Sequence, residues 1–497
     1  MSAPPEAALP QKPAHRLPRL SVLVGVTLVI GIFLSARSSL TTDEAFTLHT
    51  TGRTLRHAWD EARSFEMQPP LYFLLMTLWR KLARGLEFMR LFSTLCVCLS
   101  LIQFRRLSQL LRIGGGWWDL ALLAALTPRV LWAAAEARVY ALALLLVSSM
   151  LVAAAQLWFV RSEPAWRPAL LFILTAYGAL MTQYYSGFVI AGIFSGCLLL
   201  RDRRGWWVWA ALTLLLLPWL PVILAQVHEH PTGTNTARTG TLWLNLLEVL
   251  FRWSPLVQRH SGRIVLVLLA GALLWQLVRQ RRPDAADRRL LLIGMLPALL
   301  LAALRLSGAA LVEPRHWIPA VPGLLLLWGL GLTRIADPSR RQRTAVAVFL
   351  FWGVALADFV RGYEKPEWKA VASAIRTRPG TQPVVLRRMD GLALRYYLGP
   401  DHALFGDDPS EGPPPDWAAH RIAPLDSLAV ERIAPVIAAS GGLWVVNWTR
   451  VPANTVTRDL KHWGIGQVSL ADSVTLKRFR LLYYEYDAPV GCDSVHQ

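Results

Sequence analysis

Residues 139–160 read VYALALLLVSSMLVAAAQLWFV, a run that contains no charged side chain. About 20 apolar residues in a helix are enough to cross the hydrocarbon core of a bilayer, which is about 30 Å thick. Inside lipid, every backbone donor and acceptor must be satisfied within the segment, so such a run has to form a helix. The stretch therefore predicts a transmembrane helix, and it decides the fold class of the chain.

Ten further apolar segments have the same character. They cover residues 20–36, 88–104, 117–135, 168–185, 187–200, 206–226, 263–279, 290–308, 316–333 and 344–361. The chain of 497 residues is 54% apolar and only 17% charged, whereas about 25% of an ordinary globular domain is charged. This composition excludes a disordered chain and a water-soluble enzyme. The sequence predicts an all-α polytopic membrane protein with about 11 transmembrane helices.

The basic residues set the expected orientation of these helices. The chain has 52 Lys and Arg against 33 Asp and Glu, and the Arg residues cluster between apolar runs. With eleven spans, the basic tail 1–19 and the clusters within 105–112, 201–204, 279–289 and 334–343 all fall on one side. That side is cytoplasmic by the positive-inside rule. We therefore expect a multi-pass protein of the cell's inner membrane with a cytoplasmic N-terminus, and no nucleic-acid partner.

The outer side then receives two large loops, 37–87 and 227–262, within a multi-span module of residues 20–361. Residues 69–79 (PPLYFLLMTLW) are apolar but too short to cross a bilayer, and counting them as a span would invert every later Arg cluster. We interpret them as a juxtamembrane helix on the outer face. Loop 37–87 is expected to hold at least two such helices.

Residues 362–497 differ from the rest because charge and Pro return. The pattern predicts an amphipathic helix over 367–378, buried strands at 383–386 and 443–448, and a partly alternating strand at 476–486. Residues 406–416 are expected to form a loop. The segment is therefore predicted to be a soluble α/β domain outside the membrane. The four cysteines of the chain show no zinc-ligand or disulfide spacing.

Two adjacent carboxylates, Asp43 and Glu44, follow the first span on the outer side. Carboxylates at a membrane surface are available for general-base catalysis. The stretch TTDEAF is also a good helix start, with a Thr cap and acids in the first turn. The two interpretations are compatible, because a helix N-terminus also fixes the position of a catalytic acid.

Three outer turns carry further polar candidates. Arg138 and Arg315 could each neutralise a lipid phosphate with a planar guanidinium group. Arg138 could instead pair with Glu136 or extend to the interface. The remaining candidates are the residues Tyr140, Tyr184, Tyr185 and His316, for which an interface or structural role stays open. We predict that Asp43, Arg138 and Arg315 line one cavity at the outer membrane boundary.

The order of short motifs resembles that of the GT-C glycosyltransferases. Asp43-Glu44 comes first, then PPLY at 69–72, MRLFS at 89–93 and EARVY at 136–140. Within this superfamily the chain is similar to the protein O-mannosyltransferase-like and aminoarabinose-transferase-like families over residues 20–335. The sequence departs at Gln68, where related sequences often have His or Lys before the two prolines.

The resemblance implies transfer of a sugar from a polyprenyl-phosphate donor to an acceptor outside the membrane. Asp43 would be the general base with Glu44 in support, and Arg138 and Arg315 would bind the donor phosphate. A phosphate leaving group needs charge neutralisation rather than protonation, so one base suffices for a single displacement with inversion. Further donor or acceptor contacts would come from Gln68, Tyr140, Tyr184, Tyr185 and His316.

Several points stay open at this level. No cofactor is indicated, and a divalent cation is compatible with the chemistry although no motif calls for one. The acceptor could be a lipid, a glycan or a protein, and membrane lipids surround the spans. The alternatives are a secondary transporter, which places polar groups near the membrane midplane, and a ligase or polymerase of surface glycans.

Overall fold

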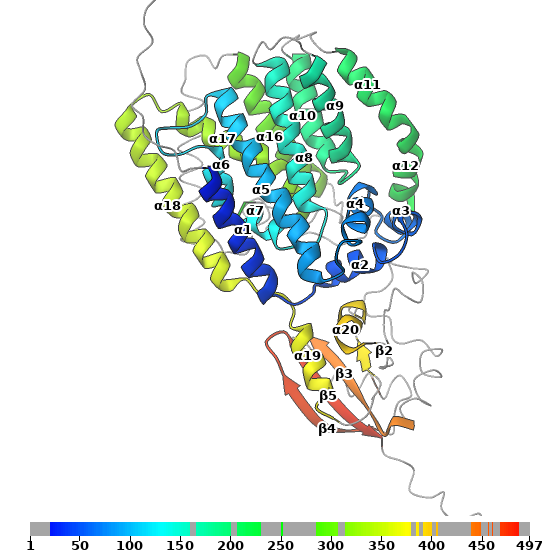
Figure 1. The fold of residues 1–497 in the computed structure, drawn as a ribbon. Helices are drawn as coiled ribbons and strands as arrows, with labels where there is room; N and C mark the ends of the chain where they lie inside the picture. The colour runs from blue at the N-terminus through cyan, green and yellow to red at the C-terminus, as the bar shows by residue number, and fades with distance from the viewer. Residues whose placement is uncertain are drawn as a thin grey trace, which may run out of the picture.

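The computed structural model describes most of the apolar part of the chain. The described residues are 20–159, 166–199, 206–229, 250–251, 285–306, 314–378, 384–386, 391–399, 404–405, 439–448, 456, 460 and 468–486. The expected tail 1–19, the span 263–279, the loop 406–416 and most of loop 227–262 lie outside them. The described chain forms a helical bundle with a small sheet domain at one end (Figure 1).

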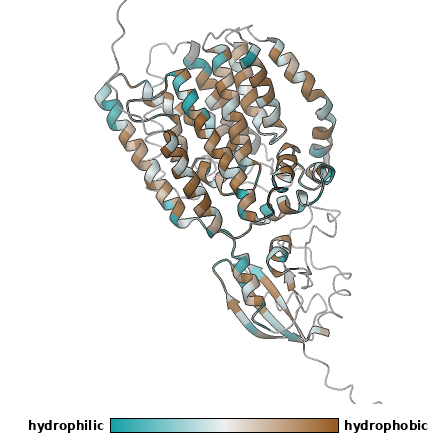
Figure 2. Cartoon of the chain, viewed as in Figure 1, coloured by the Kyte–Doolittle hydropathy of each residue, from teal (hydrophilic) through white to brown (hydrophobic). Residues whose placement is uncertain are grey.

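Six helical segments among the described residues are long and apolar enough to cross a membrane. They are α1 (Leu20–Arg37), α5 (Leu86–Leu111), α8 (Tyr140–Trp158), α11 to α12 (Trp206–Leu216 and Leu220–Glu229, joined by the 3₁₀ turn η1, Leu217–Trp219), η3 to α17 (Pro314–Ala320 and Val321–Thr333), and α18 (Pro338–Gly362). Three more helices complete the bundle, namely α9 (Trp166–Leu180), α10 (Ser186–Leu199) and α16 (Ala285–Leu306). Apolar residues dominate these helices (Figure 2), which confirms the polytopic, mainly helical class.

The prediction of one continuous helix over 117–135 is wrong. The segment forms two short helices, α6 (Leu120–Ala125) and α7 (Pro128–Ala134). Pro128 cannot donate to the preceding turn and favours an extended residue before it, so Thr127 is extended and a new helix starts at Pro128. The pair still runs along most of α5, because Leu120 bonds to Ser108 and Ala134 bonds to Thr94. The parity of the later helices is therefore unchanged.

Three short helices lie at the end of the bundle nearer the sheet domain: α2 (Thr42–Thr50), α3 (Leu55–Ser64) and α4 (Leu71–Trp79). The nine residues of α4 rise only about 14 Å, too little to cross a bilayer, as expected for residues 69–79. One face of α4 packs into the bundle, since Tyr72, Phe73 and Met76 are fully buried. Its position at a membrane surface remains a prediction.

The C-terminal segment contains a five-stranded mixed sheet in the order β2-β1-β3-β5-β4. The strands are β1 (Val384–Leu386), β2 (Leu404–Phe405), β3 (Gly442–Trp448), β4 (Val468–Thr475) and β5 (Phe479–Tyr486). β1 pairs in parallel with β2 and β3, while β3, β5 and β4 are antiparallel neighbours. Two helices accompany the sheet, α19 (Trp368–Ile375) and α20 (Gly391–Leu398). The predicted helix and three strands are present, whereas β2, β4 and α20 were not anticipated.

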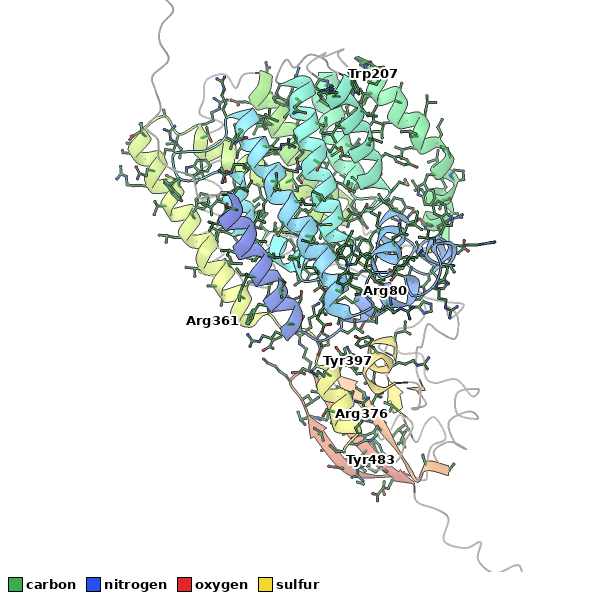
Figure 3. All side chains as sticks on the ribbon, in the orientation of Figure 1. Arg80, Trp207, Arg361, Arg376, Tyr397 and Tyr483 are labelled. Atoms are coloured by element: carbon green, nitrogen blue, oxygen red, sulfur yellow. The ribbon has the colours of Figure 1, made fainter. Side chains whose placement is uncertain are left out.

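The sheet domain shares a hydrophobic core with the membrane module. Leu40, Ala45 and Leu86 belong to the same buried cluster as Trp368 and the inner face of the sheet. The backbone N–H of Leu40 also donates to the hydroxyl of Tyr397 on α20, at 2.8 Å. Figure 3 shows Tyr397 at this junction. The C-terminal domain therefore contacts the start of α2, the helix that carries Asp43.

The two ends of the bundle differ in charge. The described Arg clusters lie at the C-terminal ends of α5 and α17 and at the N-terminal ends of α16 and α18. Figure 1 shows these helix ends together, away from α2 and the sheet domain. The described members of the predicted Arg clusters thus share one end, as the sequence predicted, whereas Arg80, Lys81 and Arg84 follow α4 at the opposite end. The assignment of that end to the cytoplasm remains a prediction.

Candidate active site

The start of α2 fixes two neighbouring carboxylates in different surroundings. Thr41 caps the helix: its hydroxyl accepts from the backbone N–H of Glu44, and the Glu44 carboxylate accepts from the backbone N–H of Thr41. This reciprocal capping box confirms that TTDEAF is a helix start. The side chain of Glu44 is fully buried, whereas that of Asp43 is 31% exposed. Of the two acids, only Asp43 is accessible to a substrate.

Glu44 is the centre of a buried ion cluster. Its carboxylate accepts from Arg90 at 2.7 and 2.8 Å, from Lys365 at 3.0 Å and from the backbone N–H of Ala137 at 3.0 Å. Burial alone would raise the pKa of Glu44, but the charges and hydrogen bonds of Arg90 and Lys365 outweigh it and hold the pKa below its ordinary value. Lys365 also pairs with Glu136 at 3.3 Å. The cluster joins α2, α5, the turn before α8 and the linker to the sheet domain.

Asp43, Arg138 and Arg315 come together, whereas the cavity at the membrane boundary that they were expected to line stays a prediction. The Arg315 guanidinium forms an ion pair with the Asp43 carboxylate, and both side chains are 31% exposed. Arg138 donates to the backbone carbonyl of Asp43 at 3.0 Å and to the hydroxyl of Thr47 at 3.0 Å. A partly exposed acid and a partly exposed cation are therefore in contact at the end of the bundle next to the sheet domain.

Arg138 is already neutralised by a residue that sequence reasoning missed. Its guanidinium donates to Glu66 at 2.9 Å, and both side chains are almost completely buried. Burial raises the pKa of Glu66, and the charge of Arg138 opposes this rise. Any phosphate bound by Arg138 would have to compete with Glu66. Arg315, by contrast, is paired with an exposed partner.

Glu66 and Gln68 flank a constrained backbone position. Met67 between them has φ of 50°, in the left-handed region that side-chain-bearing residues seldom adopt. Such conformations persist only where the surrounding structure holds them, and they concentrate at ligand sites. Only Gln68 separates this position from the two prolines of the PPLY motif.

Near this turn, four buried polar atoms have no hydrogen-bond partner among the described residues. The backbone N–H of Leu71 donates to the carbonyl of Met181 at 2.9 Å, which joins the start of α4 to the turn before α10. The four atoms come from the two sides of this junction and are Gln68 Oε1, Tyr72 OH, Gln183 Oε1 and Ser186 Oγ. Buried polar atoms normally have a hydrogen-bond partner. These four atoms are therefore suited to bind hydroxyl groups of a ligand.

The aromatic candidates divide into three environments. Tyr185 stacks on His316 with ring centroids 4.9 Å apart, directly after Arg315 in the chain. The Tyr184 hydroxyl donates to Gln226 at 2.7 Å and accepts from Trp219 at 3.1 Å. Tyr140 points into the core, where its ring lies 4.9 Å from Trp132.

These positions refine the predicted donor and acceptor contacts. His316 and Tyr185 adjoin the ion pair of Asp43 and Arg315. Tyr184 links α12 to the turn before α10. Tyr140 is 2% exposed, and its burial gives no support to a direct ligand contact. Arg90 and Lys365 were also missed, although Arg90 is a charge within an apolar run, which is itself a signal of a functional or paired residue.

A scan against protein-family models and a search of curated proteins gave no match. Solved structures do match. ArnT from Cupriavidus metallidurans bound to undecaprenyl phosphate has a TM-score of 0.59 at 15% identity, covering 93% of this chain and 97% of that chain. The apo state of the same protein gives 0.57 at 13% identity with the same coverage.

An archaeal oligosaccharyltransferase from Archaeoglobus fulgidus, in complex with Zn and sulfate, has a TM-score of 0.50 at 10% identity. The match covers 85% of this chain and 67% of that chain. At these identities the likeness concerns the fold. Together with the helical bundle, the short helices α2 to α4 and the appended sheet domain, it shows that the chain shares the fold of these structures, the GT-C fold that the sequence resemblance implies.

Proposed function

We propose that the protein transfers a sugar from a polyprenyl-phosphate donor to an acceptor hydroxyl on the outer side of the cytoplasmic membrane. The observation that carries this proposal is the contact of an exposed carboxylate, Asp43, with an exposed guanidinium, Arg315. The neighbouring acids Glu44 and Glu66 are buried in ion pairs of their own. The site thus offers one base and one phosphate ligand, which is what a displacement from a lipid phosphate requires.

The reaction is a single displacement with inversion. The acceptor oxygen forms a bond to the anomeric carbon while the bond from that carbon to the phosphate oxygen breaks. The leaving polyprenyl phosphate keeps the electron pair, and Arg315 stabilises its charge. Asp43 takes the proton of the acceptor hydroxyl and later releases it to water. Donor phosphate would compete with Asp43 for Arg315, so donor binding frees the base.

Two further features support a lipid-linked donor. The ArnT structure of the same fold was determined with undecaprenyl phosphate, which is the carrier class proposed here. The unpartnered atoms of Gln68, Tyr72, Gln183 and Ser186 provide buried groups for sugar hydroxyls. We place this end of the bundle outside the membrane, because the Arg clusters lie at the other end. The acceptor is a lipid, a glycan or a protein.

A reconstituted transfer assay tests the proposal. The purified protein in nanodiscs is given radiolabelled polyprenyl-phosphate sugars and detergent-solubilised cell envelope as acceptor. We expect label to move to an acceptor and free polyprenyl phosphate to appear in equal amount. Sealed vesicles provide the control for the transporter alternative: sugar accumulation inside them without release of polyprenyl phosphate would contradict transfer. Transfer of preassembled glycan only would favour a ligase.

A further inference from the structure

Three side chains with metal-binding atoms converge beside the proposed site, at the junction of α2 and α3. His49 lies in the last turn of α2, and His57 and Glu61 lie one helical turn apart on α3. Their potential ligand atoms all lie within 4.8 Å of one another. Among the described residues this is the one group of at least three His, Cys, Asp or Glu that could hold a metal ion.

The distances are close to those of a transition-metal site. Zinc ligands about 2.0–2.1 Å from the ion at tetrahedral angles lie about 3.3–3.4 Å from one another. Glu61 Oε2 is 3.7 Å from His49 Nε2, and Glu61 Oε1 is 3.8 Å from His57 Nδ1. These two distances involve different oxygens of Glu61, and one ligand atom from each residue lies within 4.8 Å of the others, so shifts on the order of an ångström would bring three atoms to coordination distance.

The hydrogen bond of His57 is of the kind that orients a metal-binding histidine. Nε2 of His57 lies 3.3 Å from the backbone carbonyl of His49, to which it donates. The other ring nitrogen, Nδ1, faces Glu61 at 3.8 Å. A ligating histidine commonly donates its other N–H to a carbonyl in this way, which fixes the tautomer and ring orientation. The His49 ring is in turn held by edge-on packing against Phe65 at 5.5 Å.

We propose that His49, His57 and Glu61 bind one divalent transition-metal ion of the zinc type. Two imidazoles and a carboxylate match the ligand preference of zinc, and the partial exposure of all three leaves a fourth position for water. The ion ties the C-terminal end of α2 to α3. Because Asp43 lies in the first turn of α2 and α3 leads to Glu66, the metal would hold together the helices that present the site.

Zinc binding by the full-length protein tests this directly. The tag is removed, the detergent-solubilised protein is stripped with a chelator, and zinc is titrated in competition with a chromophoric indicator. We expect the wild type to bind one zinc equivalent more than the double variant His49→Gln/His57→Gln. Glu61→Gln should weaken that site at least tenfold. Asp60→Asn is the matched control, because Asp60 lies on the same helix and pairs with the exposed Arg56.

A second readout is the thermal unfolding midpoint, which zinc should raise in the wild type and in Asp60→Asn only. Equal zinc stoichiometry in the wild type and the double variant would overturn the proposal, since any bound zinc would then belong to other residues. The absence of stoichiometric binding by the wild type would overturn it as well. If the double variant does not purify as a folded protein, Glu61→Gln alone decides between these outcomes.

Discussion

Replacing Glu44 by Gln should destabilise the protein strongly while leaving its chemistry largely intact. The substitution keeps the size of the side chain and removes its charge. In the native structure this carboxylate neutralises Arg90 and Lys365, and the side chains of all three residues are almost completely buried. Glu44→Gln therefore leaves two buried cations with insufficient negative charge around them. Glu136 remains as a partner for Lys365, at 3.3 Å.

The size of the effect follows from this burial. Removing one partner from a buried ion pair typically costs about 3–5 kcal/mol, because the remaining charge stays desolvated. Glu44 also accepts hydrogen bonds from the backbone N–H groups of Thr41 and Ala137. The amide oxygen of Gln preserves part of these contacts. We therefore expect a loss of about 3–5 kcal/mol in the free energy of unfolding.

The measurement is detergent-induced unfolding followed by tryptophan fluorescence, with turnover per folded molecule measured in parallel. The matched control is Glu87→Gln, an exposed Glu in the first turn of α5, which should cost less than about 1 kcal/mol. A Glu44→Gln protein within about 1 kcal/mol of the wild type would refute the argument from buried charge. If it cannot be purified, Lys365→Met removes one cation, retains the Arg90 pair and should be tolerated better.

Three further results are expected. Arg315→Gln should lower turnover about 10²–10³-fold and weaken donor binding, as measured by transfer and donor-binding assays, and Arg315→Lys should recover part of both. Unchanged donor affinity would show that Arg315 is not the phosphate ligand. The pKa of Glu44 in the folded protein lies below its unfolded value of about 4.5, so its contribution to stability is present above that pH and is lost as the pH falls further. The thermal unfolding midpoint should therefore decrease when the pH is lowered below about 5, and it should decrease more steeply in the wild type than in Glu44→Gln. Tyr397→Phe should cost about 0.5–1.5 kcal/mol of unfolding free energy, because the buried Leu40 N–H loses its acceptor; no change would mean that water replaces the hydroxyl.

Hydropathy and charge predicted most of the architecture, because a lipid environment constrains sequence strongly. Runs such as 139–160 have one possible structure in a bilayer, and α8 occupies Tyr140–Trp158. The Arg clusters correctly placed the turns containing Asp43, Arg138 and Arg315 at the same end of the bundle. The break at Pro128 was missed because hydropathy averages over a window and takes no account of one residue without an N–H.

The partners within the site were less predictable. Arg138 pairs with Glu66, which lies 72 positions away in the sequence, instead of with the nearby Glu136. In the sequence Glu44 resembles a second catalytic acid, yet in the structure its carboxylate forms buried ion pairs with Arg90 and Lys365. Which acid pairs with which cation depends on the side chains that tertiary packing buries together, and the spacing of residues along the chain does not reveal it.

The most direct test of the account compares Asp43→Asn with the wild type in a single-turnover experiment with bound polyprenyl-phosphate sugar. Asn caps and starts a helix about as well as Asp, so the fold should be retained. Loss of a general base should slow sugar transfer about 10²–10⁴-fold, while donor affinity should be retained or rise, because the proposed phosphate ligand Arg315 stays and loses its competing carboxylate. Near-normal transfer by folded Asp43→Asn would contradict the central claim, and it would leave the exposed carboxylate at the start of α2 without a catalytic role.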